Sequence, residues 1–134
     1  MIRVVVADDS AFMRKVLSDL FEKTPGFQMV GTARDGREAV KLVAKERPDL
    51  LTLDINMPVM DGLTATKEIR SLSRPDAASV PIIALTANAF TENIRKCREA
   101  GMNDHIAKPL DINRIYRILA QYITQPEEDS HDES

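Results

Sequence analysis

Short apolar segments rich in Val, Ile and Leu alternate along the chain with longer stretches that carry a helical apolar period. Two of these segments, Val4–Ala7 and Ile82–Leu85, contain no alternating polar residues, which is typical of strands buried on both faces. Phe27–Ala33 is more mixed, as expected of a strand nearer the edge of a sheet. The pattern predicts five strands, at Ile2–Ala7, Phe27–Ala33, Leu50–Leu53, Ile82–Leu85 and His105–Ala107.

Apolar residues at helical spacing predict a helix after the first strand and another after the second. The first has an apolar stripe at i, i+3, i+4, i+7 and i+8, and Pro25-Gly26 follows its end. The stripe consists of Met13, Val16, Leu17, Leu20 and Phe21. The second helix is expected to begin at Asp35, with Glu38 three residues later as in a capping box, and to end before Pro48.

Three more helices follow in the second half of the chain. We expect one from about Leu63 to Arg70, a loop over Ser71–Ser79, and another helix over Thr91–Ala100 with Gly101 as its C-terminal stop. The last helix is capped by Asp111. Its predicted inner face consists of Ile112, Ile115, Tyr116, Leu119 and Ile123.

The order of these elements predicts the fold class. Strands separated by helices of this length require crossover connections, which produce a parallel sheet. We therefore expect a (βα)5 domain of the α/β class, in which helices cover both faces of a doubly wound, five-stranded parallel sheet. A length of 134 residues fits one domain, which we place at residues 1–123. Residues 124–134 form an acidic tail that we expect to be disordered.

Charge and composition narrow the classes of partner. The net charge is −3, but five of the 21 acidic residues lie within the last ten positions, so residues 1–124 are nearly balanced. A basic excess that would favour nucleic acid is missing. No apolar run approaches the ~20 residues needed to span a membrane, and we expect no signal peptide, because a strand-like segment begins at Ile2. With a single cysteine, Cys97, the sequence predicts a cytoplasmic protein without membrane or nucleic-acid partners.

Polar residues follow four of the predicted strands at their carboxyl ends, where ligands bind in open parallel sheets. The first strand is followed by Asp8 and Asp9, and the third by Asp54. Thr86 follows the fourth strand and Lys108 the fifth. The predicted topology therefore brings three carboxylates, one hydroxyl and one ammonium group to the same edge of the sheet.

This group of side chains favours phosphoryl transfer with a hard metal ion. Three carboxylates repel one another unless a cation joins them, and a set of oxygen ligands selects Mg²⁺. Asp8 and Asp9 are adjacent and suited to hold the metal, whereas Asp54 stands alone and is our predicted nucleophile. The loop after Asp54 can supply the backbone carbonyl of Asn56 to the metal. Lys108 and the metal would stabilise charge on the transferring oxygens.

Five motifs occur in order on the expected elements: Asp8-Asp9-Ser10, Asp54 with Met57-Pro58, Met60-Asp61-Gly62, Thr86-Ala87 and Lys108-Pro109. Each alone is weakly specific, but as a set they make the chain closely similar to the receiver domains of response regulators over residues 1–123. The resemblance implies the flavodoxin-like receiver fold of two-component signalling. It also implies a cis peptide bond before Pro109, which an X-Pro bond tolerates far better than other peptide bonds.

The resemblance also implies a function. A histidine kinase or histidine phosphotransfer protein would pass a phosphoryl group to Asp54, where Thr86 would hydrogen-bond it and Lys108 would pair with it. The metal ligands would be Asp8, Asp9, Asp54 and the backbone carbonyl of Asn56. Such a domain is no enzyme in the usual sense, but a phosphoacceptor that takes part in its own phosphorylation and autodephosphorylation. It signals to a protein target, which the sequence does not identify.

A conformational switch is the remaining implication. In relatives, the residue matching Thr86 moves toward the phosphoryl group, and a Tyr or Phe ring three residues before the lysine fills the vacated space. Here that position holds His105, so either its imidazole switches or it ends a loop at the surface. The surface expected to change is the one formed by residues 90–107 and the exposed side of residues 111–122.

The two halves of the chain resemble different receivers. The segment Val5–Arg14 is most similar to chemotaxis receivers, including those of methylesterases. Val80–Ala89 and the following Gly101-Met102-Asn103-Asp104 are more similar to receivers attached to hybrid sensor kinases. The resemblance therefore indicates a phosphorelay of two-component type without selecting a pathway.

Three alternative functions fit the sequence less well. Phosphatases similar to haloacid dehalogenases require two aspartates spaced by one residue after the first strand, whereas Asp8 and Asp9 are adjacent. A nucleotide-binding domain would need a glycine-rich loop after that strand, and none follows. The third alternative is a phosphorylation-independent protein-interaction module. Degenerate receivers of that kind lose one of the acidic or lysine positions, whereas this sequence keeps all of them.

Overall fold

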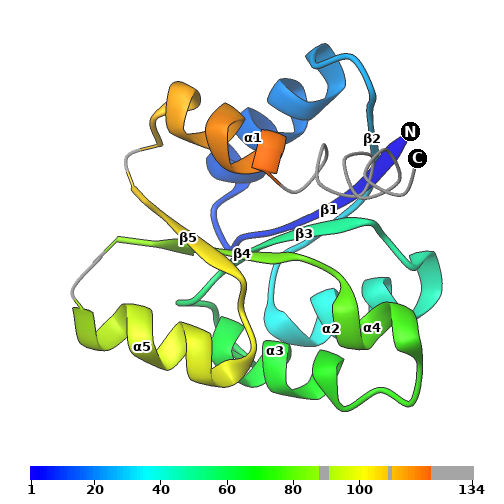
Figure 1. The fold of residues 1–134 in the computed structure, drawn as a ribbon, viewed down its shortest axis with the longest axis vertical. Helices are drawn as coiled ribbons and strands as arrows, with labels where there is room; N and C mark the ends of the chain where they lie inside the picture. The colour runs from blue at the N-terminus through cyan, green and yellow to red at the C-terminus, as the bar shows by residue number, and fades with distance from the viewer. Residues whose placement is uncertain (88–90, 109, 122–134) are drawn as a thin grey trace, which may run out of the picture.

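The computed structural model describes residues 1–87, 91–108 and 110–121, and five strands in this part form one parallel sheet in the order β2-β1-β3-β4-β5 (Figure 1). The strands are β1 (Ile2–Ala7), β2 (Phe27–Ala33), β3 (Leu50–Asp54), β4 (Ile82–Thr86) and β5 (Asp104–Ala107). All five predictions are confirmed, and β3, β4 and β5 are each one residue longer than expected. The added residues include Asp54 and Thr86, which are therefore the last residues of their strands.

Helices cover both faces of this sheet, which confirms the doubly wound architecture. They are α1 (Ala11–Lys23), α2 (Gly36–Glu46), α3 (Gly62–Arg70), α4 (Pro75–Ser79), α5 (Thr91–Ala100) and a C-terminal helical segment over residues 112–121. Figure 1 shows α1 and the C-terminal segment, in orange, on one face and α2 to α5 on the other. None of the helices in the described ranges is long and apolar enough to cross a membrane.

Two apolar cores, one on each face of the sheet, account for the strand pattern. Side chains of successive strand residues point to opposite faces, so Val4 and Val6 pack in a cluster with Phe21 of α1. Val5 and Ala7 belong to the other cluster, together with residues of α2 and α3. Because both faces of β1 are covered, the strand has to be apolar at every one of these positions.

Helix caps fix where the main elements begin. The Asp35 side chain accepts a hydrogen bond of 2.9 Å from the backbone N–H of Glu38, and the Glu38 carboxylate accepts one of 2.9 Å from the N–H of Arg34. Asp111 likewise accepts from the N–H of Asn113 at 2.9 Å, so it caps the C-terminal segment as predicted. A side-chain cap of this kind contributes about 1 kcal/mol to stability.

The predicted loop over Ser71–Ser79 is wrong in part, because Pro75–Ser79 form the short helix α4. Pro75 occupies its first turn, where a missing N–H costs nothing and the fixed φ suits a helix. The preceding Arg74 donates to the carbonyls of Val43, at 3.1 Å, and Ala44, at 2.6 Å. A five-residue helix is too short to show an apolar helical period in the sequence. Contacts with residues distant in sequence hold α4 in place.

The predicted inner face of the C-terminal segment is also partly wrong. Ile115 and Leu119 are buried, but Ile112 is 55% exposed and Tyr116 is 43% exposed, while the buried Ile118 completes the inner face. The buried stripe therefore consists of Ile115, Ile118 and Leu119, at i, i+3 and i+4, and it is rotated away from the predicted face. The Tyr116 hydroxyl lies 3.4 Å from the Thr24 hydroxyl at the end of α1, a polar contact that keeps its end at the surface. Ile123 lies outside the described residues.

Candidate functional site

The carboxylates of Asp8, Asp9 and Asp54 meet at the carboxyl edge of the sheet, as the sequence predicts. Strands β1 and β3 are neighbours, with Ala7 opposite Leu53, so the residues that follow in each chain are brought side by side. One oxygen atom from each carboxylate lies within 4.8 Å of the others. Asp8 and Asp54 are buried, whereas Asp9 is exposed. The group therefore opens to solvent on the side of Asp9.

Lys108 reaches this group from the end of β5, with β4 between it and β3. Its ammonium nitrogen lies 3.1 Å from Oδ2 of Asp8 and 3.4 Å from Oδ2 of Asp54. The backbone holds the residue in place, because the N–H of Lys108 donates to the carbonyl of Thr86 at 2.8 Å. Thr86 is the buried last residue of β4 and lies opposite Ala107 of β5. All five residues predicted from the strand ends therefore lie at the carboxyl edge of the sheet.

Two tight turns orient the buried carboxylates. Oδ1 of Asp8 accepts a hydrogen bond of 2.9 Å from the N–H of Ser10, and Oδ1 of Asp54 accepts one of 3.0 Å from the N–H of Asn56. Aspartate forms such turns readily, because its side chain replaces a backbone carbonyl. Each Oδ1 atom accepts a hydrogen bond from its own loop, and each Oδ2 atom therefore faces Lys108.

Burial and charge change the proton affinities of these groups. The pKa of Asp54 is raised from its ordinary value of 3.8 to about 6, chiefly by burial and also by the charge of Asp8, against the opposing N–H of Asn56 and charge of Lys108. Burial lowers the pKa of Lys108, but its contacts with Asp8 and Asp54 more than offset this, so the pKa lies above the ordinary value. Lys108 is therefore a fixed positive charge, while Asp54 is held in a place unfavourable to its own charge.

The donor set fits a divalent cation. Oδ2 of Asp8 is completely buried and, among the described residues, has no hydrogen bond of good geometry, only the ion pair with Lys108. A buried carboxylate oxygen in this state is costly, and one ammonium group does not balance three carboxylates. Oxygen ligands alone suit Mg²⁺ or another hard ion.

The loop between β3 and α3 contains a strained turn that sequence reasoning missed. The N–H of Met60 donates to the carbonyl of Pro58 at 2.6 Å, and Val59 between them has a φ of 67°. This is a γ-turn with a positive central φ, a rare conformation that is especially unfavourable for a β-branched residue. Such strain costs about 1–3 kcal/mol. No local sequence signal for this conformation exists, because valine is among the residues that adopt it least.

Two glycines fix this loop against its surroundings. The carbonyl of Met60 accepts a hydrogen bond of 2.9 Å from Gly36 at the start of α2, and a Cβ on Gly36 would lie 2.2 Å from that oxygen. A Cβ on Gly62 would lie 2.4 Å from the backbone oxygen of Asp54. Glycine is therefore required at both positions. Asp61 caps α3 through the N–H of Thr64, which accounts for the Asp61-Gly62 pair as helix-start chemistry.

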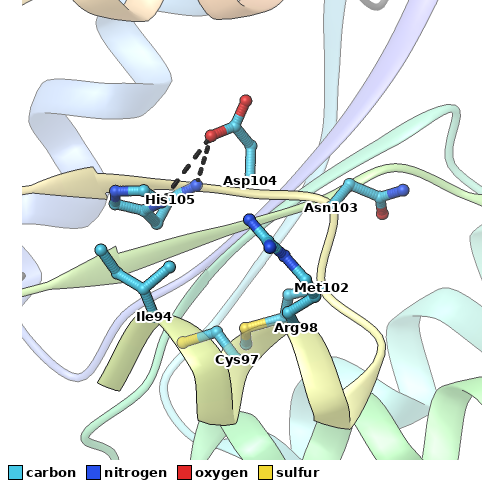
Figure 2. A pocket seen from close by; sticks show the side chains of 7 residues that line it. All are labelled: Ile94, Cys97, Arg98, Met102, Asn103, Asp104 and His105. Atoms are coloured by element: carbon cyan, nitrogen blue, oxygen red, sulfur yellow. Dashed lines mark hydrogen bonds and ion pairs between the residues drawn. The ribbon is translucent and has the colours of Figure 1, made fainter. Parts of the chain in front are cut away.

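His105 lies apart from the carboxylates, on β5 beside α5 (Figure 2). Its ring nitrogen Nδ1 is 3.8 Å from Oδ1 of Asp104, which also accepts a hydrogen bond of 2.8 Å from the backbone N–H of His105. The side chain is about one quarter exposed. It lines a small cavity of about 60 Å³ with Ile94, Cys97, Arg98, Met102, Asn103 and Asp104. Asp104 is thus a polar neighbour for the ring that the strand prediction did not provide.

Comparison with known proteins identifies the chain. Residues 4–120 match the sequence profile of the response regulator receiver domain. The chain belongs to this family. It is therefore a receiver domain of two-component signalling, and the five-stranded parallel sheet is the receiver fold that the motifs predicted. Pro109, the second residue of the lysine motif, lies outside the described residues.

The receiver domain matches parts of longer relatives. It is 48% identical over 108 residues to a protein-glutamate methylesterase/protein-glutamine glutaminase of Caldanaerobacter subterraneus, covering 81% of this chain and 29% of that protein. A protein of the same description from Pyrococcus horikoshii is 46% identical, with coverage of 81% and 28%. The receiver domain thus spans about a third of the length of these curated relatives.

Solved structures include receivers of both kinds that the two halves of the sequence resemble. The chemotaxis response regulator CheY4 of Vibrio cholerae has a TM-score of 0.83 and 30% identity, covering 92% of this chain and 99% of that one. The response regulator domain of Thermotoga maritima CheB has a TM-score of 0.77 and 33% identity, with coverage of 93% and 95%. The receiver domain of a Pseudomonas aeruginosa sensor histidine kinase, with magnesium in its active site cleft, has a TM-score of 0.80 and 34% identity, with coverage of 92% and 98%.

Proposed function

We propose that this receiver domain accepts a phosphoryl group from a phosphohistidine of a histidine kinase or histidine phosphotransfer protein onto Asp54. In this step the phosphorus–nitrogen bond of the phosphohistidine breaks, a bond forms between phosphorus and a carboxylate oxygen of Asp54, and imidazole leaves. The observation that carries the proposal is the position of the buried Oδ2 of Asp54, 3.4 Å from the ammonium group of Lys108 and beside two further carboxylates. Positioned opposite charges are the main means by which proteins assist this reaction.

Each neighbouring side chain has a role in the proposal. Lys108 now pairs with Asp8 and Asp54, and it would pair with the phosphoryl oxygens once these replace a free carboxylate. Thr86, at the end of β4, would donate its hydroxyl hydrogen to a phosphoryl oxygen. Its place in the sheet supports this role, because β4 lies between β3 and β5 and thus between Asp54 and Lys108.

The proposed metal is Mg²⁺. Its ligands would be Asp8, Asp9, Asp54 and the backbone carbonyl of Asn56. When bound, the ion neutralises charge that accumulates on the transferring oxygens. The exposed position of Asp9 supports entry of a hydrated ion from solvent, and the buried Oδ2 of Asp8, which pairs with Lys108 but accepts no hydrogen bond, supports its retention.

We propose that phosphorylation changes the surface formed by α5, β5 and the C-terminal segment, and that a protein target binds this surface. His105 lies on this face and is a candidate for the switch, in step with Thr86. The relatives favour a chemotaxis-type or hybrid-kinase phosphorelay in the cytoplasm. The receiver domain would contribute to its own phosphorylation and autodephosphorylation, while any further activity would belong to other domains or partners.

Acetyl phosphate with Mg²⁺ tests the proposed chemistry. We expect intact-mass measurement to show one phosphoryl adduct on the parent and none on Asp54→Asn. Asp61→Asn is the matched control, because Asp61 is an exposed aspartate on the same loop, where it caps α3. This variant should still take the adduct. An adduct that persists in Asp54→Asn would overturn the assignment. A phosphotransfer profile against the histidine kinases and phosphotransfer proteins of the source organism then identifies the donor.

A further inference from the structure

Arg14 of α1 uses its charged side chain to bind the backbone beside the carboxylate site. Its Nη1 atom donates to the carbonyl of Asp8 at 2.8 Å, and the side chain is partly buried. Among the described residues, Arg14 forms no ion pair with a carboxylate. Its charge therefore strengthens a hydrogen bond to a carbonyl instead of neutralising an acid. Arg14 touches no reacting atom of the proposed transfer, so this contact needs a separate explanation.

The contact closes the turn that contains Asp9. The backbone N–H of Arg14 donates to the carbonyl of Ser10 at 3.0 Å, while its side chain donates to that of Asp8. Asp9 lies between these two residues, so Arg14 binds the carbonyls on both sides of it. The N–H of Ser10 also donates to Oδ1 of Asp8 at 2.9 Å. The turn from β1 into α1 is therefore closed on both sides of the exposed Asp9.

The sheet does not hold the Asp8 carbonyl in place. The pairing of β1 with β2 and with β3 ends at Ala7, so this carbonyl lies beyond the paired part of the strand. It belongs to the peptide that leads to Asp9, and Asp8 is completely buried. A buried carbonyl without a partner is costly, so without Arg14 the peptide would rotate toward another donor. Such a rotation would displace the carboxylate of Asp9.

We infer that Arg14 is a positioning residue for the metal ligands Asp8 and Asp9. By binding the carbonyl of Asp8, it fixes the peptide between them and keeps the carboxylate of Asp9 near those of Asp8 and Asp54. One oxygen atom of each lies within 4.8 Å of the others, which suits a single ion. This inference rests on the proposed function, in which these carboxylates bind Mg²⁺. Groups that orient metal ligands in this way commonly change metal affinity by about 10–100-fold.

Positioning and charge predict opposite effects of Arg14 on Mg²⁺ binding. A guanidinium group behind the site repels a second cation, so its charge alone weakens Mg²⁺ binding, and removing it would raise the affinity. A residue that holds the turn has the reverse effect. Its removal lowers the affinity, because part of the binding free energy is then needed to order Asp9. The sign of the change therefore distinguishes the two effects.

A Mg²⁺ titration of three variants tests the inference. Arg14→Met removes the charge and the donor but keeps a long apolar side chain, whereas Arg14→Lys keeps the charge and a shorter donor. Lys15→Met is the matched control, because it removes the same charge from the next position, where Lys15 is 78% exposed and pairs with Asp19 at 3.4 Å. By titration calorimetry, we expect Arg14→Met to lose affinity roughly tenfold or more and Arg14→Lys to lose less. Lys15→Met should stay within about twofold of the parent, because exposed charges are screened.

A second measurement needs no metal. In EDTA, the amide shifts of Asp9 and Ser10 should change more in Arg14→Met than in Lys15→Met, because the turn has lost a hydrogen bond. Circular dichroism shows whether each variant is folded. If Arg14→Met does not fold, Arg14→Gln replaces it, because this change also removes the charge and shortens the side chain, and the same loss of affinity is expected.

Other outcomes separate this inference from the proposed function. A folded Arg14→Met with unchanged or higher Mg²⁺ affinity would overturn the inference, and so would an equal loss in Lys15→Met. The chemistry at Asp54 would still stand in either case if acetyl phosphate with Mg²⁺ gives the adduct on the parent. If the parent binds no Mg²⁺, the proposed metal site fails and the inference fails with it.

Discussion

The ammonium nitrogen of Lys108 lies 3.4 Å from Oδ2 of Asp54, although 54 positions separate the two residues in the chain. The contact exists because Asp54 ends β3 and Lys108 follows β5 of the same parallel sheet, with β4 between these two strands. It favours the ionised form of Asp54, but burial and the charge of Asp8 act in the opposite direction and keep the pKa at about 6. The site is therefore short of positive charge before any ion binds, and several measurable consequences follow from this imbalance.

Asp54→Asn should stabilise the metal-free domain above pH 6. Between 3.8 and about 6 the folded state holds the Asp54 proton when the unfolded chain has lost it, so stability falls as pH rises through this window. The variant escapes this loss, and its gain should be on the order of 1–3 kcal/mol at pH 7 and vanish near pH 4. Urea unfolding across this range without Mg²⁺ measures it. A gain that is independent of pH would contradict the assigned cause.

Phosphorylation by acetyl phosphate should depend on the same proton. Only the ionised carboxylate attacks phosphorus, so at low Mg²⁺ the rate should fall as pH drops below about 6. Raising the Mg²⁺ concentration should shift the midpoint to lower pH, because the cation favours the charged form. Initial rates at several Mg²⁺ concentrations test both statements. A midpoint near 3.8 at every concentration would show that the carboxylate is not perturbed.

Mg²⁺ binding should depend on Asp9 although this residue is exposed. Asp9→Ala removes one of three carboxylates without disturbing the core, so we expect an affinity loss of roughly tenfold or more, together with loss of the stabilisation that Mg²⁺ gives the parent. Titration calorimetry and thermal unfolding measure the two effects. Asp61→Ala serves as a control for charge, since Asp61 caps α3 and should leave Mg²⁺ affinity nearly unchanged. Unchanged affinity in Asp9→Ala would remove Asp9 from the metal site.

The sequence predicted the parts of this structure that rest on local rules. Buried strands show as apolar runs, and Asp35 and Asp111 show as helix caps, because burial and capping leave a signal within a few residues. The candidate site could be predicted too, since the carboxyl ends of parallel strands must meet. Its five residues therefore followed once the strands were expected to form one parallel sheet.

Some of the features that escaped prediction depend on contacts distant in sequence, and others on a local conformation that the sequence does not favour. Helix α4 is held by Arg74 against the end of α2, and Tyr116 is kept at the surface by its contact with Thr24. The strained Val59 contradicts its own conformational preference, and Asp104 meets the His105 ring only because of its position at the start of β5. Local propensity says nothing about such relationships, which the surrounding fold imposes.

Gly62→Ala should destabilise the domain although alanine is normally favoured over glycine in a helix. The added Cβ would lie 2.4 Å from the backbone oxygen of Asp54, so the loop or the strand end has to move. We expect a loss of about 1–3 kcal/mol in urea unfolding and slower phosphorylation by acetyl phosphate. Gly26→Ala is a control with a positive φ of 93° but open space around the Cβ, so it should cost stability without affecting phosphorylation. Normal phosphorylation of Gly62→Ala would show that the contact tolerates the change.

The remaining prediction concerns His105 as a switch. The ring lies beside Asp104, whose Oδ1 is 3.8 Å from Nδ1. The charged groups nearby are Arg98 of α5, which lines the same cavity, and Arg114, which donates to the His105 carbonyl at 3.3 Å. If the ring moves inward on phosphorylation, it must leave Asp104 and become less solvated, so the side chain at this position determines how easily the movement occurs.

Activation should therefore depend on the side chain at position 105. Amide shifts of α5, β5 and the C-terminal segment, recorded with and without beryllofluoride, measure the response. His105→Ala should weaken the response, because no ring is left to fill the space, whereas His105→Tyr should preserve it. Asp104→Asn is the matched control, since it removes the carboxylate beside the ring but leaves the ring in place, and it should keep the response. If His105→Ala responds as the parent does, His105 is a surface residue at the start of β5 and takes no part in signalling.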